Sequence, residues 1–151
     1  MLGWNPDILG PMMTRTTQIL LTLTAIQLGI IPLFSDINAS HLFHDGWPPH
    51  ARFHTAWAIT VGAGLALYVL LLVWAPAEDR AQRLRYASAP GCIFLGAFFI
   101  AFFFMDDFGG GLTDVDDPIK FFGFDGNVFA FSIAAIVQAM ATLLAWRARD
   151  A

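Results

Sequence analysis

The sequence is short of charged residues. Only 13% of its 151 residues are Asp, Glu, Lys or Arg, whereas 57% are hydrophobic and 15% are aromatic. Soluble globular domains carry about 25% charged residues, so this chain has too few to cover a surface that faces water. The composition therefore excludes a soluble enzyme and a disordered tail.

Cysteine and positive charge are also scarce. The single cysteine, Cys92, excludes an intrachain disulfide and a thiol-only metal cluster. The formal net charge of −4 provides no basic surface for nucleic acid, which is therefore not an expected partner. What remains is one small integral membrane domain over residues 1–151, with the lipid bilayer as its surroundings.

Long runs without charged residues dominate what is present. A helix needs about 20 apolar residues to cross the hydrocarbon core of a bilayer. Four stretches without Asp, Glu, Lys or Arg meet or approach that length, namely residues 18–34, 53–74, 86–105 and 128–146. A transmembrane β-barrel would instead show short segments of alternating hydrophobicity. The predicted fold class is therefore all-α, a four-helix transmembrane bundle.

Basic residues are distributed unevenly around these spans. Six of the eight precede the first span, separate the second from the third, or follow the fourth: Arg15, Arg80, Arg83, Arg85, Arg147 and Arg149. Loops rich in Lys and Arg stay in the cytoplasm. Both termini and the middle loop are therefore predicted to be cytoplasmic, and the first and third loops face the opposite compartment.

The other ionisable residues gather in the first and third loops. All four histidines and eight of the twelve acidic residues lie in or beside them. The third loop, residues 106–127, holds six aspartates and is predicted to be a solvated acidic lid. Ionisable groups next to a bilayer are costly and are usually functional. We therefore predict a functional site at the non-cytoplasmic end of the bundle.

Proline indicates where the second span begins. Proline is tolerated in the first turn of a helix, so the Pro-Pro pair at 48–49 predicts a helix that starts there. His50 and His54 then lie on one face of its opening turns. A short antiparallel connection from the first span brings further polar side chains against the same place. The predicted site residues are Asp36, Asn38, His41, His50 and His54.

Acid–base catalysis is the leading hypothesis for this cluster. Imidazoles and a carboxylate in a partly dry pocket can act as general acid and base. The protein would then isomerise, cyclise or hydrate an amphiphilic isoprenoid, sterol-like or other lipid substrate, with no cofactor. Asp36 would exchange protons with the substrate together with His50 or His54, whereas His41 and Asn38 would orient it.

Two alternatives remain open on the sequence. Copper, zinc and iron favour nitrogen and oxygen donors, and a metal-binding protein would use Asp36, His41, His50 and His54 as ligands. The spacing does not decide between metal binding and acid–base chemistry, because no established metal-protease signature is present. The other alternative is a non-catalytic subunit that packs in a homo-oligomer or a larger membrane complex.

The first loop also resembles a known pattern. Residues 36–54 read DINASHLFHDGWPPHARFH, which resembles a segment of an uncharacterised family of short fungal and bacterial four-span membrane proteins. The pattern there is D-x-N-x-[S/T]-H, a spacer, and W-P-P-H-A-[R/K]-F-H. The resemblance implies that all five predicted site residues belong to the motif, whereas His44 departs from an Asn. It implies no activity.

A fainter similarity is to the EXPERA group, the four- or five-span bundles that include sterol isomerases and related sterol-binding proteins. Residues 32–36, PLFSD, are similar to the segment that carries a ligand-facing aspartate in that group. The group also uses an acidic residue on its second helix, where this chain offers His50 and His54 instead. This is a fold-level analogy and does not establish function.

Small residues within the spans predict where helices pack closely, because small side chains let membrane helices approach each other. They recur at four-residue spacing as Ala25 and Gly29, as Ala56, Thr60 and Gly64, and as Ala135 and Ala139. Two polar residues at membrane depth, Gln27 and Gln138, are predicted to find partners inside the bundle or to line a cavity.

Overall fold

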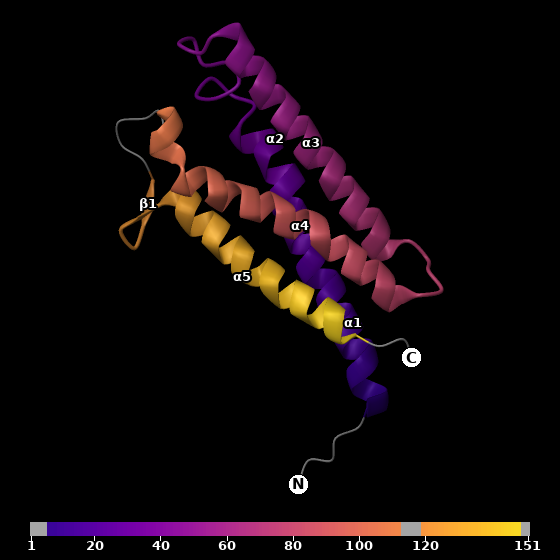
Figure 1. Ribbon diagram of the computed structural model, residues 1–151. Helices are drawn as coiled ribbons and strands as arrows, with labels where there is room; N and C mark the ends of the chain where they lie inside the picture. Colours follow the sequence, from indigo (N-terminus) through magenta and orange to yellow (C-terminus); the bar gives the residue numbers. More distant parts are fainter. Residues whose placement is uncertain (1–5, 113–118, 149–151) are drawn as a thin grey trace.

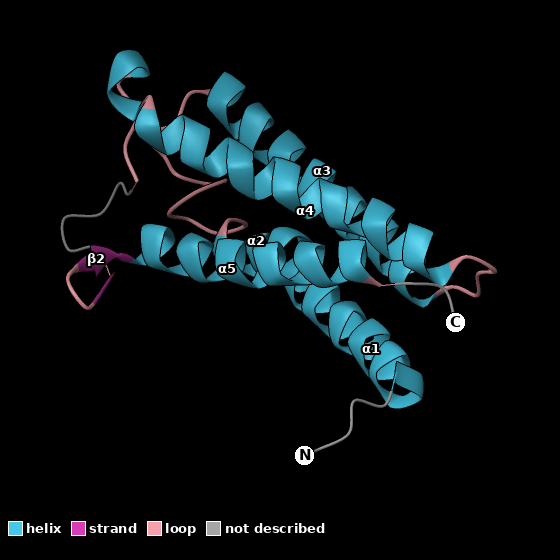
Figure 2. Ribbon diagram, turned by 60° about the horizontal axis from the view of Figure 1, so that its bottom comes forward, coloured by secondary structure: helices cyan, strands magenta, loops and turns pink. Residues whose placement is uncertain are grey.

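The computed structural model is a bundle of four helical crossings, shown in Figures 1 and 2, and it describes residues 6–112 and 119–148. The first crossing consists of α1 (Pro6–Ala25), the π-helix η1 (Ile26–Ile30) and α2 (Ile31–Ser35). The other crossings are α3 (Pro49–Trp74), α4 (Arg80–Phe103) and α5 (Gly126–Arg147). All four are long and apolar enough to cross a membrane. The predicted all-α fold is confirmed, and the protein is a multi-pass membrane protein.

The third loop contains the short elements of the fold. The 3-10 helix η2 (Met105–Phe108) follows α4, and the antiparallel strands β1 (Lys120–Phe121) and β2 (Phe124–Asp125) precede α5. The acidic run at 114–117 lies outside the described residues, so the lid stays a prediction.

Helix ends follow local capping and do not follow the ends of the uncharged stretches. α3 begins at Pro49, as the Pro-Pro pair predicts. α4 begins at Arg80, six residues before the predicted span, because the Asp79 carboxylate accepts a hydrogen bond of 2.7 Å from the backbone N–H of Gln82. The Asp125 carboxylate caps α5 in the same way through the N–H of Asn127, at 2.8 Å. The helix α4 therefore includes Arg80, Arg83 and Arg85, which the uncharged stretch 86–105 leaves out.

The arginines in the first turns of α4 bind the carboxyl-terminal ends of neighbouring helices. Arg80 donates to the carbonyl oxygens of Val73 and Ala75, both at 3.0 Å. Arg85 donates to the carbonyl oxygen of Ala148 at 2.9 Å, beyond the end of α5. The last carbonyls of a helix have no partner within it and carry partial negative charge. Arg80 and Arg85, which were used to predict the cytoplasmic side, therefore also join the ends of α3 and α5 to the start of α4.

The packed core lies towards this arginine end of the bundle. Its buried residues are Leu21, Ala25, Ala66, Val69, Val73, Leu84, Ala87, Ala141 and Ala145. At the opposite end, α2 and the start of α3 lean away from the adjoining ends of α4 and α5 (Figure 1). We call this opposite end the loop end, because it carries the first and third loops.

One close helix crossing involves Gly29 of η1 and α3. A β-carbon on Gly29 would overlap the β-carbon of Ala66 and lie 2.9 Å from the carbonyl oxygen of Gly62. Gly29 was predicted to pack closely, but its partners on α3 are Gly62 and Ala66, whereas a β-carbon on Gly64 would meet nothing within 4 Å. The buried face of α3 consists of Ile59, Gly62, Ala66, Val69 and Val73, and the four-residue spacing of small residues does not by itself identify that face.

The buried face of α5 also differs from the prediction. It consists of Ala134, Gln138, Ala141 and Ala145, whereas Ala139 is exposed and Ala135 is partly exposed. The Gln138 amide donates to the carbonyl oxygen of Ser88 on α4 at 2.7 Å. Gln138 therefore finds partners inside the bundle, as predicted for a polar residue at this depth.

Candidate functional site

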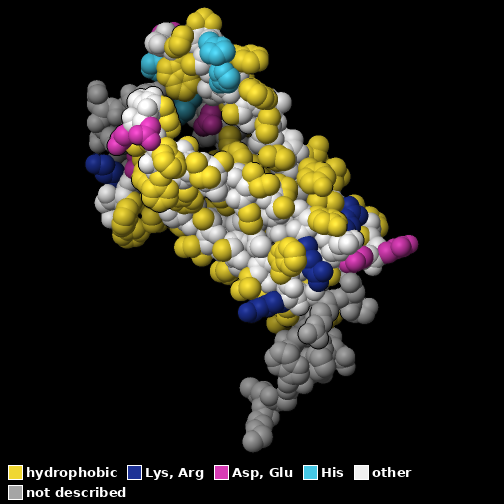
Figure 3. Space-filling view, viewed as in Figure 1, with side chains coloured by type: hydrophobic (Ala, Val, Ile, Leu, Met, Phe, Trp, Pro, Cys, Tyr) yellow, Lys and Arg dark blue, Asp and Glu magenta, His cyan; other side chains and the backbone are white. Residues whose placement is uncertain are grey.

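A cavity of about 630 Å³ lies at the loop end, between η1, α2 and the start of α5. Its apolar lining consists of Ile31, Pro32, Phe121, Phe129, Ala130, Phe131 and Ile133. Its polar lining consists of Gln27, Ser35, Asp36, His41 and Asn127. The space-filling view shows the molecule hollowed at this end, with acidic and histidine side chains visible in the hollow (Figure 3). The cavity thus combines a mainly apolar wall with a group of polar side chains.

A π-helical turn forms one side of this cavity. η1 widens the first crossing directly before Pro32, a residue that has no N–H to donate. The Gln27 side chain in this turn lines the cavity and donates to the carbonyl oxygen of Ala130 on α5, at 3.4 Å. Single π-helical turns are frequent at functional sites. The π-helical turn therefore carries the polar Gln27 side chain on the side of the first crossing that faces the cavity.

Asp36 and His41 are the two predicted site residues that line the cavity. Asp36 follows the last residue of α2, and its carboxylate accepts a hydrogen bond of 2.6 Å from the Ser35 hydroxyl. The His41 ring nitrogen Nδ1 lies 2.9 Å from the Ser40 hydroxyl. A carboxylate accepts protons, and an imidazole both accepts and donates them. This pair therefore has the groups that acid–base chemistry requires.

Asn38 organises the turn that carries His41. Its side-chain oxygen accepts hydrogen bonds from the Ser40 N–H at 2.9 Å, the Ser40 hydroxyl at 2.7 Å and the His41 N–H at 3.1 Å. Its amide nitrogen donates to the carbonyl oxygen of Ser35. Asn38 is not among the residues that line the cavity. Asn38 thus holds the turn that carries His41, and its predicted role of orienting a substrate stays a prediction.

Replacing Asn38 by alanine is expected to loosen this turn without opening the bundle. Three accepted hydrogen bonds are lost, at about 0.5–1.5 kcal/mol each, and they are local to residues 35–41. Hydrogen exchange measured by mass spectrometry should rise over residues 36–44 and stay unchanged in α4. Asn38→Asp keeps the acceptor oxygens and should retain most of the protection. Equal protection in wild type and Asn38→Ala would show that this side chain does not hold the turn.

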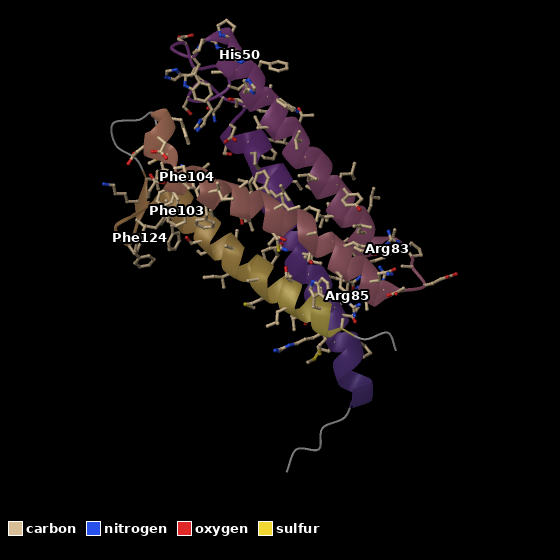
Figure 4. All side chains as sticks on the ribbon, viewed as in Figure 1. His50, Arg83, Arg85, Phe103, Phe104 and Phe124 are labelled. Carbon is tan, nitrogen blue, oxygen red and sulfur yellow. The ribbon has the colours of Figure 1, made fainter. Side chains whose placement is uncertain are left out.

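His50 and His54 form a separate pair on the first turns of α3. Their Nε2 atoms lie 3.0 Å apart and their rings are perpendicular. Both side chains are exposed, and neither lines the cavity. Figure 4 shows His50 at the outer tip of α3. The His54 ring also contacts the rings of Phe53 and Trp57 on its own helix.

The single cluster predicted from the sequence is therefore divided in two. Asp36 and His41 line the cavity, whereas His50 and His54 lie outside it. Within residues 6–112 and 119–148, no group of three or more His, Cys, Asp or Glu side chains could hold a metal ion. The described part of the chain thus does not bring the predicted metal ligands Asp36, His41, His50 and His54 together.

Several residues of the cavity were not predicted as site residues. Gln27 was recognised as a polar residue at membrane depth that would find partners or line a cavity, and it does both. Phe121, Phe129 and Phe131 could not be singled out, because they are three of fifteen phenylalanines. Ser35 and Asn127 lie at span ends, where polar residues are ordinary.

Comparison with known proteins identifies the family. Residues 20–151 match the model of a family described as "Family of unknown function (DUF6640)". The chain belongs to this family. The match covers every residue that lines the cavity. No curated protein and no solved structure matches the chain. The predicted membership of an uncharacterised family is confirmed, whereas the 36–54 motif and the similarity to EXPERA bundles stay predictions.

Proposed function

We propose that the protein binds an amphiphilic small molecule of isoprenoid, sterol-like or other lipid character in this cavity, and that Asp36 and His41 exchange protons with its polar end. The observation that carries the proposal is a cavity of about 630 Å³ whose polar side chains accompany a mainly apolar wall. Small-molecule sites typically have volumes of about 300–1,000 Å³, mostly apolar linings and a few polar groups.

The lining indicates the chemistry of the ligand's polar end. Among the described residues that line the cavity, Asp36 is the only one with a formal charge when histidine is neutral. Gln27 and Asn127 supply amides, and Ser35 supplies a hydroxyl. A carboxylate without a basic neighbour in the lining prefers a ligand that donates hydrogen bonds. A hydroxylated or protonatable end fits this set, and an anionic end does not.

The division of the predicted cluster changes the assignment of catalytic roles. Asp36 and His41 are the groups that we assign to proton exchange on the bound molecule, whereas His50 and His54 are not in the lining. Isomerisation, cyclisation or hydration needs a proton donor and a proton acceptor close to the reacting atoms. By the distribution of basic residues, this site faces the non-cytoplasmic side.

The test is mass spectrometry of the molecules that remain bound to the protein after purification in mild detergent. Asp36→Asn should reduce the occupancy of the retained amphiphile by about tenfold or more, because a hydrogen bond to a charged group contributes about 1.5–3 kcal/mol. Asp45→Asn is the matched control, since this aspartate is an exposed residue of the same loop and does not line the cavity.

The same variants separate catalysis from binding. Addition of the identified amphiphile to wild-type protein should yield a product of altered structure, and His41→Gln should stop its formation while retaining the bound molecule. Recovery of the amphiphile unchanged from wild type would contradict catalysis. Equal occupancy in wild type and Asp36→Asn would contradict the proposed site.

A further inference from the structure

The hairpin that precedes α5 has an unusual turn. β1 and β2 pair with Lys120 opposite Asp125 and Phe121 opposite Phe124, which leaves Phe122 and Gly123 as a two-residue turn. Both have positive φ angles, 52° and 86°. Turns of this kind favour Asn-Gly, and a bulky residue in the left-handed region is a genuine outlier. The backbone therefore disfavours a phenylalanine here, which indicates that the side chain has a role of its own.

Three apolar side chains in and beside the hairpin are largely exposed. Phe122 is 89% exposed, Ile119 is 74% exposed and Phe124 is 61% exposed. Phe103 and Phe104 lie at the other end of the same loop, where α4 ends. Both of these are also exposed. These apolar side chains are not covered by the rest of the described chain. Exposing them to water would be unfavourable.

The hairpin also forms part of the cavity wall. Phe121 lines the cavity and its ring stacks on Phe129, with centroids 5.3 Å apart. The Phe122 ring lies 5.8 Å from the same Phe129 ring. Phe129 is itself a lining residue on the first turn of α5. The exposed tip and the cavity are thus joined through one aromatic side chain.

The connection to α5 places the hairpin near the membrane boundary. The Gly126 N–H, at the first residue of α5, donates to the Ile119 carbonyl oxygen at 2.8 Å, which holds the hairpin against the helix start. Aromatic side chains favour the layer between the hydrocarbon core and water. The exposed Lys120 at the hairpin base can reach lipid phosphates from this layer.

We propose that the hairpin inserts its turn, Phe122 and Gly123, into the headgroup layer of the bilayer that the protein spans, and holds the mouth of the cavity against lipid. An amphiphile dissolved in the bilayer then passes beside Phe122 and Phe129 into the cavity. The passage of a ligand rests on the proposed function of the cavity, whereas the insertion of the turn does not.

The insertion is tested with a nitroxide spin label on the hairpin tip. Phe122→Cys is prepared in a Cys92→Ser background and reconstituted into phosphatidylcholine vesicles, with Asp107→Cys on η2 as the control position in the same loop. Collisions with a water-soluble nickel complex should be several-fold less frequent at position 122 than at position 107, and collisions with oxygen should be more frequent. If Phe122→Cys does not fold, the same measurement is made with the label at Phe124→Cys.

Two results would overturn the insertion. Nickel accessibility equal to that at position 107 would mean that the tip lies in water. Low accessibility to both nickel and oxygen would mean that protein covers the tip, as in an oligomer.

The passage of the ligand is tested with Phe122→Asn, which suits a left-handed turn and removes the aromatic ring. Transfer of the identified amphiphile from vesicles to the protein should be several-fold slower in this variant, with unchanged final occupancy. An unchanged transfer rate would contradict passage beside Phe122. The label measurement needs no ligand, so its outcome is independent of the Asp36→Asn experiment.

Discussion

Gly29→Ala is expected to lower the free energy of unfolding by about 3 kcal/mol, at the upper end of the usual cost of overpacking a core. The new β-carbon would overlap that of Ala66 and lie 2.9 Å from the Gly62 carbonyl oxygen and 3.1 Å from the α-carbon of Ala63. Two of these three neighbours are backbone atoms, which cannot move aside as a flexible side chain does. The first crossing must therefore shift away from α3.

The matched control is Gly64→Ala on α3. A β-carbon there meets nothing within 4 Å, and alanine favours the helical state over glycine. Thermal unfolding in detergent, followed by tryptophan fluorescence, should show a lowered midpoint for Gly29→Ala and an unchanged or raised midpoint for Gly64→Ala. The crossing assigned to Gly29 would be wrong if both variants unfolded at the wild-type midpoint.

Gly91→Ala is expected to cost about 2 kcal/mol, for a different reason. A β-carbon on Gly91 would overlap the Gln138 side-chain oxygen and lie 2.6 Å from its amide carbon. Gln138 is 2% exposed, and its nitrogen is held by the Ser88 carbonyl and the Thr142 hydroxyl. The amide can therefore move away only by losing these hydrogen bonds.

A double-mutant cycle isolates this contact. Gln138→Ala removes the overlapping atoms, so Gly91→Ala should cost much less in that background than in wild type. A coupling free energy of about 0.5–3 kcal/mol is typical of residues in contact. Gly96→Ala on the same helix is the control, because a β-carbon there meets nothing within 4 Å. Additive unfolding free energies for Gly91→Ala and Gln138→Ala would contradict the close approach of α4 and α5 at this point.

The same amide shows how much a single polar residue reveals at membrane depth. Gln138 was expected to find partners because an unpaired amide in hydrocarbon is costly, and it does so across to α4. Its oxygen is buried without a hydrogen-bond donor. Burial of a polar group was thus predictable, whereas its partner helix was not.

The small residues show the opposite case. Alanine and glycine occur on several faces of these helices, so their spacing predicts close packing without specifying which face is involved. Gly29 was recognised correctly, but the prediction for α3 named Gly64 where the structure uses Gly62 and Ala66. Only the pairing of helices distinguishes these positions, since a free apolar helix presents similar surfaces all round.

The candidate site was also predictable only in part, because the sequence does not specify how the helices pair. Low charge, uncharged stretches of membrane length and the Pro-Pro pair were enough to predict four helical crossings, the start of α3 and a polar loop end, because each depends on local chemistry. Whether the histidines of α3 line the same cavity as Asp36 depends on the direction of α3, which arises from packing between helices distant in sequence. Tertiary structure therefore decided that the acidic residue shares a cavity with His41 and with aromatic residues from α5, and that the two histidines of α3 form a pair outside it.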